Sequence, residues 1–271
     1  MEKIIGFIGA GNMGQAMAGG IISSGMVKAE NIIFSDTSNE NLKKAYGKYK
    51  VKTSNSNVLL ASMSDIIVLS VKPNIYPTVI EEIRDYIKPE TLIITIAAGI
   101  TLAKAEELFG KDMKIVRTMP NTPAMAGEGM TAVVPNRFVT DEEICEVMEI
   151  LNSFGKAEIV EEKLIDSVIA VSGSSPAYVY MMIEAMADAA VAGGMPREKA
   201  YKFAAQAVYG SAKMVLETGI HPGELKDMVC SPGGTTIEAV AVLEEYGFRN
   251  AIIKAMKRCE EKSKEMTNSK K

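Results

Sequence analysis

The chain has 271 residues, of which 47% are hydrophobic, and a formal net charge of −4 at pH 7. This length is enough for one large domain or two ordinary ones with substantial cores. The negative charge, the absence of a Lys/Arg stripe and the lack of tryptophan argue against a general nucleic-acid-binding protein.

Composition also argues against membrane and disulfide-rich classes. The N-terminus enters a strand-like run without a basic region and a long apolar segment, so we expect no signal peptide. No stretch reaches the ~18 uncharged apolar residues of a membrane span. Cys145, Cys230 and Cys259 are far apart and odd in number, which fits a reducing cytoplasm and predicts neither a disulfide framework nor a metal site.

The first 161 residues alternate between strand-like and helical patterns. We predict strands at residues 3–9, 31–36, 65–71, 91–97, 114–119, 130–136 and 156–162. Helices are predicted between them at residues 12–25, 38–47, 74–87, 101–110 and 141–155. Short β-rich runs separated by amphipathic helices are typical of βαβ units with a parallel sheet.

From residue 162 to residue 271 the pattern is helical. Helices are predicted over 163–194 and 196–219, the latter with Pro196 near its start and Gly219 after its end. Two more helices follow a Pro-Gly-Gly turn, and residues 260–271 are interpreted as a solvated, frayed helix end. The predicted fold is α/β: a Rossmann-type dinucleotide-binding domain (1–161) followed by an all-α dimerisation and substrate-binding domain (162–271).

One helix of the second domain is apolar around most of its circumference. The side chains concerned are Met181, Met182, Ile183, Met186, Ala189 and Ala190. Such a helix must be buried nearly all round, and a domain of about 110 residues has limited room to do so alone. We therefore expect an intimate oligomer.

A glycine-rich turn follows the first predicted strand and begins the first helix. Gly9, Gly11 and Gly14 have the G-x-G-x-x-G spacing, and Asp36 ends the next strand. The first glycine permits the tight turn, the second allows backbone to approach a pyrophosphate, and the third allows close helix–strand packing. We predict a dinucleotide site that includes Gly9, Ala10, Gly11, Asn12, Met13 and Gly14.

Further coenzyme contacts are expected from loops at the carboxyl ends of the other strands. These loops are Ser70–Asn74, Ala97–Thr101 and Met119–Pro123. The residues predicted to contact coenzyme in the first two are Val71, Lys72, Pro73, Ala97, Ala98 and Gly99.

Asp36 is predicted to influence coenzyme choice. A carboxylate at the end of the second strand can accept both ribose hydroxyls of NADH and would repel a 2′-phosphate. The flanking hydroxyls of Ser35, Thr37 and Ser38 offer an alternative, since they could bind a phosphate. We expect NADH to be accepted, with at most a small disadvantage against NADPH.

The expected hydride chemistry lacks an obvious proton donor. Reduction of a ketone also needs a proton, usually from a positioned Lys, His or Tyr. Residues 172–190 contain neither Lys nor His, and we interpret Tyr178 and Tyr180 as core residues and Glu184 and Asp188 as solvated or interface residues. The single histidine, His221, is interpreted as a turn residue before a short helix.

A protonated imine removes the need for that donor, because hydride addition to an iminium carbon gives a neutral amine directly. The enzyme then has to orient the substrate and stabilise its other charge. The Pro-Gly-Gly turn places N–H groups and hydroxyls at a helix start, where the dipole favours an anion by ~0.3–2 kcal/mol. We predict that a substrate carboxylate binds at Ser231, Gly233, Gly234, Thr235 and Thr236. The alternative is that Thr235 or Thr236 only caps the helix.

Several blocks of sequence, in order along nearly the whole chain, resemble pyrroline-5-carboxylate reductase. They are GAGNMG, SVKPN, AAGIT, MPNTP, LIDSVIAVSGSSPAY, HPGELKDMVCSPGGTTIEAV and LEEYGFRNAI. The resemblance implies reduction of a cyclic imine acid to L-proline, the last step of proline biosynthesis, with NADPH or NADH. It also implies interlocked dimers, in some members a pentamer of dimers, with the substrate between the coenzyme and the partner subunit's SPGGTT turn.

The resemblance assigns further roles. Thr236 matches the position implied to hydrogen-bond the imine nitrogen, and Asn57 and Asn121 match positions implied in coenzyme contact. One departure is Ser175, where the family usually has glycine, and its side chain bears on how closely the backbone approaches the nicotinamide.

Two other functions remain open at this point. One is a related imine or hydroxyacid reductase on the same scaffold, although the missing helix lysine argues against hydroxyacid chemistry. The other is a non-catalytic dinucleotide-binding regulator, which would not need a second anion-binding turn.

Overall fold

A computed structural model describes residues 2–268 and divides the chain into two compact units. The sheet unit comprises the residues up to Gly173 together with those from Cys259 onward. The helical unit is Ser174–Arg258. Within the described range, no helix is both long and apolar enough to span a bilayer.

The sheet unit contains an eight-stranded sheet in the order β3-β2-β1-β4-β5-β6-β7-β8. The strands are β1 Ile5–Ile8, β2 Ile32–Ser35, β3 Lys52–Ser54, β4 Ile66–Leu69, β5 Leu92–Thr95, β6 Lys114–Met119, β7 Gly129–Pro135 and β8 Gly155–Ile159. The first six strands have the 3-2-1-4-5-6 order of a dinucleotide-binding fold. The predicted Rossmann-type architecture is confirmed.

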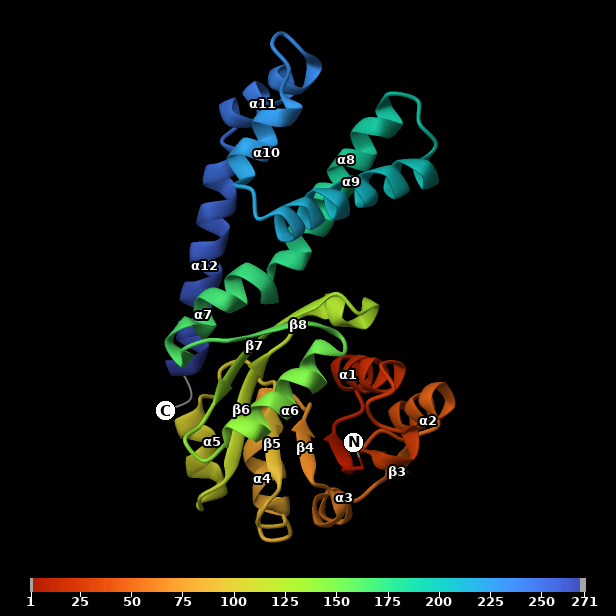
Figure 1. The fold of residues 1–271 in the computed structure, drawn as a ribbon, viewed down its shortest axis with the longest axis vertical. Helices are drawn as coiled ribbons and strands as arrows, with labels where there is room; N and C mark the ends of the chain where they lie inside the picture. Colours follow the sequence, from red (N-terminus) through yellow and green to blue (C-terminus); the bar gives the residue numbers. More distant parts are fainter. Residues whose placement is uncertain (1, 269–271) are drawn as a thin grey trace. The chain divides into compact units, whose positions relative to one another are not determined.

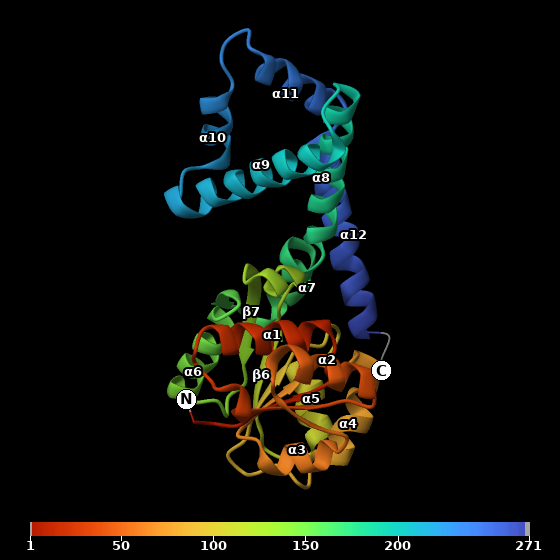
Figure 2. The ribbon, with the colours of Figure 1, turned by 90° about the vertical axis from the view of Figure 1, so that its right-hand side faces the viewer.

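Helices cover both faces of this sheet, which is why its inner strands are continuous apolar runs rather than alternating ones. They are α1 Asn12–Ser23, α2 Asn39–Tyr49, α3 Asn57–Met63, α4 Tyr76–Ile83, α5 Leu102–Phe109, α6 Asp141–Asn152 and α7 Ile165–Val168. On one face α1, α2 and α6 pack around Phe7 and Phe34, whose ring centroids lie 4.9 Å apart. On the other face α3, α4 and α5 pack around Ile67 and Leu69 (Figure 2).

The sheet differs from the prediction at β7, which pairs antiparallel with β6, while β8 pairs parallel with β7. The connection between β6 and β7 is residues 120–128. A parallel return needs a crossover of about a dozen or more residues, usually with a helix, so this short connection can only reverse the chain. The sheet is therefore mixed rather than parallel throughout.

Two elements between α2 and β4 were not predicted from the sequence. The edge strand β3 is largely exposed and has no apolar run to indicate it. It exists because its backbone pairs with β2, Ile33 opposite Lys52 and Ser35 opposite Ser54. The short helix α3 begins after Ser56, whose side chain accepts a hydrogen bond from the Leu59 N–H.

The helical unit contains α8 Ser175–Ala192, α9 Arg197–Thr218, α10 Pro222–Val229, α11 Thr235–Glu245 and the first part of α12 Phe248–Asn268. As predicted, no strand occurs in the described part of the chain after β8. Helices α8 and α9 pack side by side (Figure 1), with Ala187, Ala200 and Ala204 as their buried residues. Most of the large apolar side chains stay uncovered by this chain, including Met181, which is 68% exposed.

The C-terminal end of α12 corrects one expectation. Residues 260–268 are helical rather than frayed and belong to the sheet unit, although most side chains of 260–267 are exposed, as predicted. Ser263 is only 7% exposed and donates a hydrogen bond to Oδ1 of Asp166 at 2.6 Å. The backbone at Met266 lies beside Gly99. Residues 269–271 of the predicted frayed end lie outside the described residues.

The compact units divide at Gly173, whereas the predicted domain boundary lies between residues 161 and 162. The intervening segment contains α7 and the π-helical turn Ile169–Gly173. It stays with the sheet unit because Ile165 is buried against Met119 and Val134.

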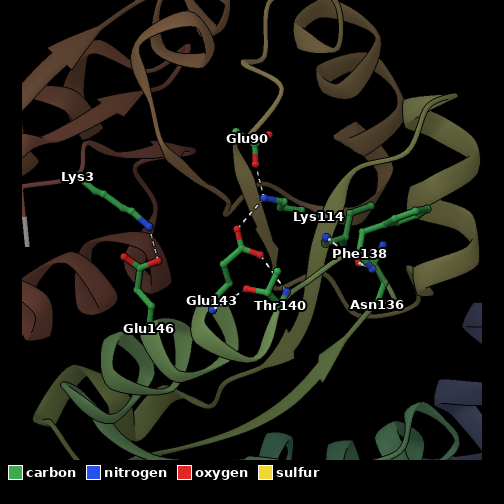
Figure 3. A network of polar contacts seen from close by, with 9 residues as sticks. Lys3, Glu90, Lys114, Asn136, Phe138, Thr140, Glu143 and Glu146 are labelled. Atoms are coloured by element: carbon green, nitrogen blue, oxygen red, sulfur yellow. Dashed lines mark hydrogen bonds and ion pairs between the residues drawn. The ribbon is translucent and has the colours of Figure 1, made fainter.

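A polar network crosses the sheet unit near the amino end of β6 (Figure 3). Lys114 forms ion pairs with Glu143 and Glu90, and its distance to Glu143 is 2.8 Å. Glu143 also closes a capping box with Thr140 at the start of α6. The side chains of Lys114 and Glu143 are only 20% and 18% exposed, so water screens this pair less than a surface ion pair.

The network shifts the pKa values of both partners. Hydrogen bonds to Glu143 and Glu90 raise the pKa of Lys114. Burial alone would raise the pKa of Glu143, but hydrogen bonds from Lys114 and from the Thr140 N–H outweigh burial, so this pKa lies below its ordinary value of 4.5. A carboxyl group whose pKa is lower in the folded state stabilises the fold at pH values above its unfolded-state pKa. This stabilisation is lost as the pH falls through the folded-state pKa.

We expect Glu143→Gln to lower the free energy of unfolding at pH 7 by about 1–2 kcal/mol, between the values for exposed and buried charged hydrogen bonds. The difference from the wild type should shrink as the pH falls below about 4.5 and disappear once the pH falls through the lowered folded-state pKa, where the wild-type carboxylate is protonated as well. Urea denaturation at fixed protein concentration measures both effects. Glu142→Gln, on the same helical turn and exposed, is the control; an equal loss in both variants would contradict a role for the network.

Candidate active site

The candidate site is at the carboxyl edge of the sheet, where the strand order reverses around β1. Strand β1 lies between β2 and β4, and all three are parallel. In open α/β sheets ligands bind in the crevice outside the strand ends at such a switch point. The predicted loops after β1, β2, β4 and β5 therefore meet at one edge of the sheet unit.

Glycine is needed at each of the three motif positions for a different local reason. Gly9 has φ +104°, and a Cβ there would lie 2.6 Å from the Ser70 carbonyl oxygen. A Cβ on Gly14 would lie 2.8 Å from the Gly9 oxygen and 2.8 Å from Oγ of Ser70. A Cβ on Gly11 would meet nothing within 4 Å. Gly9 and Gly14 are thus required by packing, whereas Gly11 leaves open the space through which a ligand can approach the backbone.

The helix that begins at this turn has an amino end suited to an anion. Gly11 is the N-cap of α1, and no side chain caps the helix. No acidic residue lies in the first turn either. The first-turn N–H groups and the helix dipole are therefore available for a phosphate group, as in other dinucleotide-binding folds. The residues present fit the predicted pyrophosphate site.

The other backbone groups of the turn are bonded within the protein. The Gly9 N–H donates to the Ser35 oxygen at 2.8 Å. Oγ of Ser70 donates to the Gly9 oxygen at 2.7 Å. Nε2 of Gln15 donates to the Ala10 oxygen at 2.7 Å. Gln15 was not predicted as a site residue, and Ser70 was predicted only as the first residue of a coenzyme loop. Neither the glycine motif nor its spacing indicates which side chains bond to the turn.

Asp36 follows β2, as predicted, but its carboxylate is bonded within the protein. Oδ2 accepts hydrogen bonds from the Ala10 N–H at 2.8 Å and from Nδ2 of Asn41 at 3.3 Å. Oδ1 accepts from the Ser38 N–H at 2.7 Å. The side chain thereby links the glycine turn to the start of α2.

The predicted coenzyme residues Ser35 and Asn57 bond to each other. Oγ of Ser35 donates to Oδ1 of Asn57 at 2.7 Å, and Nδ2 of Asn57 donates to Glu82 at 2.8 Å. Ser35 is fully buried. Asn57, the first residue of α3, thus joins the end of β2 to α4.

The loops after β4 and β5 are connected through a buried tyrosine. The Tyr76 hydroxyl donates to the Leu69 oxygen and accepts from Oγ1 of Thr95 at 2.9 Å and from the Ile96 N–H at 3.3 Å. Burial raises the pKa of Tyr76, which keeps the hydroxyl protonated. Lys72, at the start of the 3₁₀ turn Pro73–Ile75, is exposed.

Asn121 is in the loop after β6 and is 8% exposed. Its Oδ1 accepts from the Met130 N–H at 2.8 Å, and its Nδ2 donates to the Ser172 oxygen at 3.0 Å. Ser172 belongs to the π-helical turn Ile169–Gly173, a form often found at functional sites. Asn121 thus connects this loop to β7 and to the π-helical turn.

The predicted anion-binding turn lies in the helical unit. The Gly234 N–H donates to the Ser231 oxygen at 3.0 Å, and Gly233 has φ +66°. Proline followed by a glycine with positive φ is the pattern of a type II turn. Gly234 is the N-cap of α11, without a side-chain cap, so neither threonine caps the helix. Within residues 2–268, no hydrogen bond involves the hydroxyls of Ser231, Thr235 and Thr236.

Other interpretations of the helical unit have mixed outcomes. His221 is a turn residue, since Nδ1 accepts from the Gly223 N–H at 3.1 Å at the start of α10. Tyr180, predicted to be a core residue, is 58% exposed because this chain does not cover that side of α8. Asp188 forms an ion pair with Arg197. Ser175, at the position where the family usually has glycine, is the first residue of α8.

Comparisons with known proteins are decisive for the family. Residues 162–266 match the family described as pyrroline-5-carboxylate reductase dimerisation, and residues 4–99 match NADP oxidoreductase coenzyme F420-dependent. The Escherichia coli K12 pyrroline-5-carboxylate reductase is 55% identical over 269 residues, covering 99% of this chain and 100% of that protein. The chain belongs to the pyrroline-5-carboxylate reductase family.

More distant members agree along the whole length. The Methanosarcina acetivorans pyrroline-5-carboxylate reductase is 45% identical and covers 97% of each chain. The crystal structure of the Plasmodium falciparum pyrroline carboxylate reductase with NADP bound is 36% identical, with a TM-score of 0.89 and coverage of 98% of each chain. The predicted family, fold class and enzyme class are confirmed.

The two kinds of glycine in the turn allow a paired test. Gly11→Ala should leave the thermal midpoint unchanged and weaken coenzyme binding about tenfold or more, a loss of about 1.4 kcal/mol, since its methyl group enters the space left for the ligand. Gly14→Ala should lower the unfolding free energy by about 1–3 kcal/mol through overpacking against Gly9 and Ser70. Thermal melts and fluorescence titration with NADPH measure the two effects. Unchanged NADPH affinity in Gly11→Ala would contradict this site.

Proposed function

We propose that this chain reduces 1-pyrroline-5-carboxylate to L-proline with NADPH or NADH, the final step of proline biosynthesis. Membership of the family supports the substrate and the reaction. The observation that carries the proposal in this chain is a pair of helix starts, at Gly11 and Gly234, that have no side-chain cap. One suits a pyrophosphate and the other a carboxylate.

The nicotinamide coenzyme, when bound, supplies a hydride ion. The chain's part is to bind and orient it. The N–H groups at the start of α1 bind the pyrophosphate, and the missing side chain at Gly11 allows the approach. The loops containing Val71–Pro73 and Ala97–Gly99 border the coenzyme. Asn57 and Asn121 contact it as well, and each is held by a hydrogen bond, Asn57 to Ser35 and Asn121 to the Ser172 oxygen.

The substrate binds at the Ser231–Thr236 turn. Its carboxylate accepts hydrogen bonds from the uncapped N–H groups at the start of α11 and from the hydroxyls of Ser231 and Thr235. The protonated imine N–H donates to Oγ1 of Thr236. When hydride adds to the imine carbon, the π-bond electron pair moves to nitrogen and neutralises it. The reaction therefore needs no proton donor, which agrees with the absence of Lys and His from residues 172–190.

One assay separates this function from the alternatives. Oxidation of NADPH and NADH is followed with 1-pyrroline-5-carboxylate and, separately, with a 2-keto acid. We expect turnover with the imine only. Turnover with the keto acid would indicate a hydroxyacid reductase, and coenzyme binding without turnover on either substrate would indicate a regulator.

Thr236→Ala should lower kcat/KM for the imine by about 10- to 150-fold, because a hydrogen bond to a charged group contributes about 1.5–3 kcal/mol. Thr236→Ser keeps the hydroxyl and serves as the matched control, with most of the activity retained. Initial rates at saturating coenzyme give the values. An Ala variant with wild-type kinetics and an intact fold would rule out this role of Thr236.

The helical unit is proposed to form the contact of a homodimer, and dimers could be joined into a pentamer of dimers. The match of residues 162–266 to the family's dimerisation domain supports self-association. The exposed apolar side chains of α8 and α9, such as Met181, Phe203 and Leu216, supply the surface to be covered.

Met181→Lys should place a charge on this surface and produce monomeric, inactive or insoluble protein. Tyr86→Lys, which alters an equally apolar exposed residue of the sheet unit, is the control and should assemble normally. Sedimentation at micromolar concentration distinguishes the states. A stable, fully active wild-type monomer would contradict the proposed assembly.

We also place the enzyme in the cytoplasm. Within residues 2–268, none of Cys145, Cys230 and Cys259 is in a disulfide bond, in keeping with a reducing compartment.

A further inference from the structure

Both backbone polar groups of Ala10, the x of the first G-x-G, are hydrogen-bonded by side chains, so the peptides on either side of this residue are each held by one bond. Its N–H donates to Oδ2 of Asp36 at 2.8 Å, and its oxygen accepts from Nε2 of Gln15 at 2.7 Å. Ala10 is fully buried, so water cannot replace either partner freely. The two side chains come from different elements, the end of β2 and the body of α1.

These two hydrogen bonds determine the direction of the backbone N–H groups that follow Ala10 at the start of α1. Gly11, which follows Ala10, is the N-cap of α1 and has an extended backbone with φ −74° and ψ −177°. A rotation of the Ala10 peptide would change the direction of the N–H groups that follow it. A turn containing two glycines is otherwise flexible, because glycine loses more conformational freedom on ordering than any other residue.

The acceptor capacity of Asp36 is largely used by these internal contacts. A carboxylate offers about four lone-pair sites, and three are taken by the Ala10 N–H, the Ser38 N–H and Nδ2 of Asn41. Both sites of Oδ2 are occupied. To accept the two hydroxyls of a coenzyme ribose, Asp36 would have to release one of its present donors.

We propose that Asp36 and Gln15 are positioning residues, which hold the Ala10 peptide so that the N–H groups at the start of α1 face the coenzyme pyrophosphate. This role rests on the proposed function, in which a nicotinamide dinucleotide binds here. This role takes the place of the sequence-based prediction, in which Asp36 mainly distinguishes NADH from NADPH at the ribose. Because the pyrophosphate is common to NADH and NADPH, both coenzymes depend equally on the two residues.

The test measures coenzyme binding without substrate. Fluorescence titration gives Kd for NADPH and for NADH with the wild type, Gln15→Ala, Asp36→Ala and Asp36→Asn. Two controls alter nearby exposed groups outside the turn: Ser23→Ala at the end of α1 and Glu40→Gln in α2. Hydrogen–deuterium exchange of the peptide covering residues 9–14 reports on the order of the turn itself, and thermal melts report on folding.

We expect Gln15→Ala and Asp36→Ala each to raise both Kd values by about tenfold, from the loss of a hydrogen bond of about 1–1.5 kcal/mol. The ratio of the two Kd values should change less than about twofold, within the scatter of such energies. Asp36→Asn keeps one acceptor oxygen for the Ala10 N–H and should restore most of the affinity. Exchange at residues 9–14 should be faster in the two Ala variants and unchanged in the controls.

The opposite result overturns the assignment. If Asp36→Ala raises the preference for NADPH over NADH about tenfold, equivalent to ~1.4 kcal/mol, while Gln15→Ala changes neither Kd nor exchange, then the carboxylate acts on the ribose. Unchanged Kd values in both Ala variants would also refute a positioning role. The binding test contains no substrate, so its outcome does not depend on the proposed reaction. If the wild type binds both coenzymes but does not reduce the imine in the separate turnover assay, only the proposed reaction is refuted.

Discussion

The site depends on one constraint: every backbone N–H and C=O buried at the end of β1 needs a partner, because an unpaired buried polar group costs about 1–3 kcal/mol. The protein supplies these partners to Gly9 and Ala10, from Ser35, Asp36, Ser70 and Gln15. The N–H groups at the start of α1 have no side-chain partner. The hydrogen-bonded backbone groups fix the conformation of the turn. The N–H groups without a side-chain partner stay available for a ligand.

The same principle applies at the Ser231–Gly234 turn, where we propose that the substrate carboxylate binds. Pro232 and Gly233 give the Ser231–Gly234 turn its conformation, and its single internal hydrogen bond leaves the start of α11 uncapped. A helix start with a serine or threonine N-cap would have satisfied one of its own donors. With glycine as N-cap at both Gly11 and Gly234, the two helices keep these donors for ligands.

The apolar composition of the helical unit is the second large constraint. In the sheet unit helices cover both faces of the strands, and most of the large apolar side chains are buried. In the helical unit the buried residues are mostly alanines, while Met181, Phe203 and Leu216 stay exposed. A single chain therefore completes the first unit, whereas the second leaves apolar surface that self-association would remove from water.

Much of this protein was predictable from local sequence. Apolar runs bounded by turns indicated all strands except β3, because such runs are local patterns. The glycine spacing after β1, together with Asp36 at the end of the next strand, predicted a dinucleotide site there. Edge strand β3 and the antiparallel β7 escaped prediction. The first has no apolar signal of its own, and the second is decided by the length of the connection between residues 120 and 128.

By itself the sequence determined the fold class, the family and the two turns that suit anions, since each is written in short-range patterns of apolar, glycine and proline residues. Only the tertiary structure decided which side chains complete those turns. Gln15 belongs to no quoted motif, Ser70 belongs to a predicted coenzyme loop that gives no sign of its bond to the Gly9 oxygen, and Asp36 is oriented by donors that come from separate elements. The end of α12 likewise joins the sheet unit through contacts between distant residues, such as that of Ser263 with Asp166. Such contacts depend on where distant elements meet in space, which no local pattern encodes.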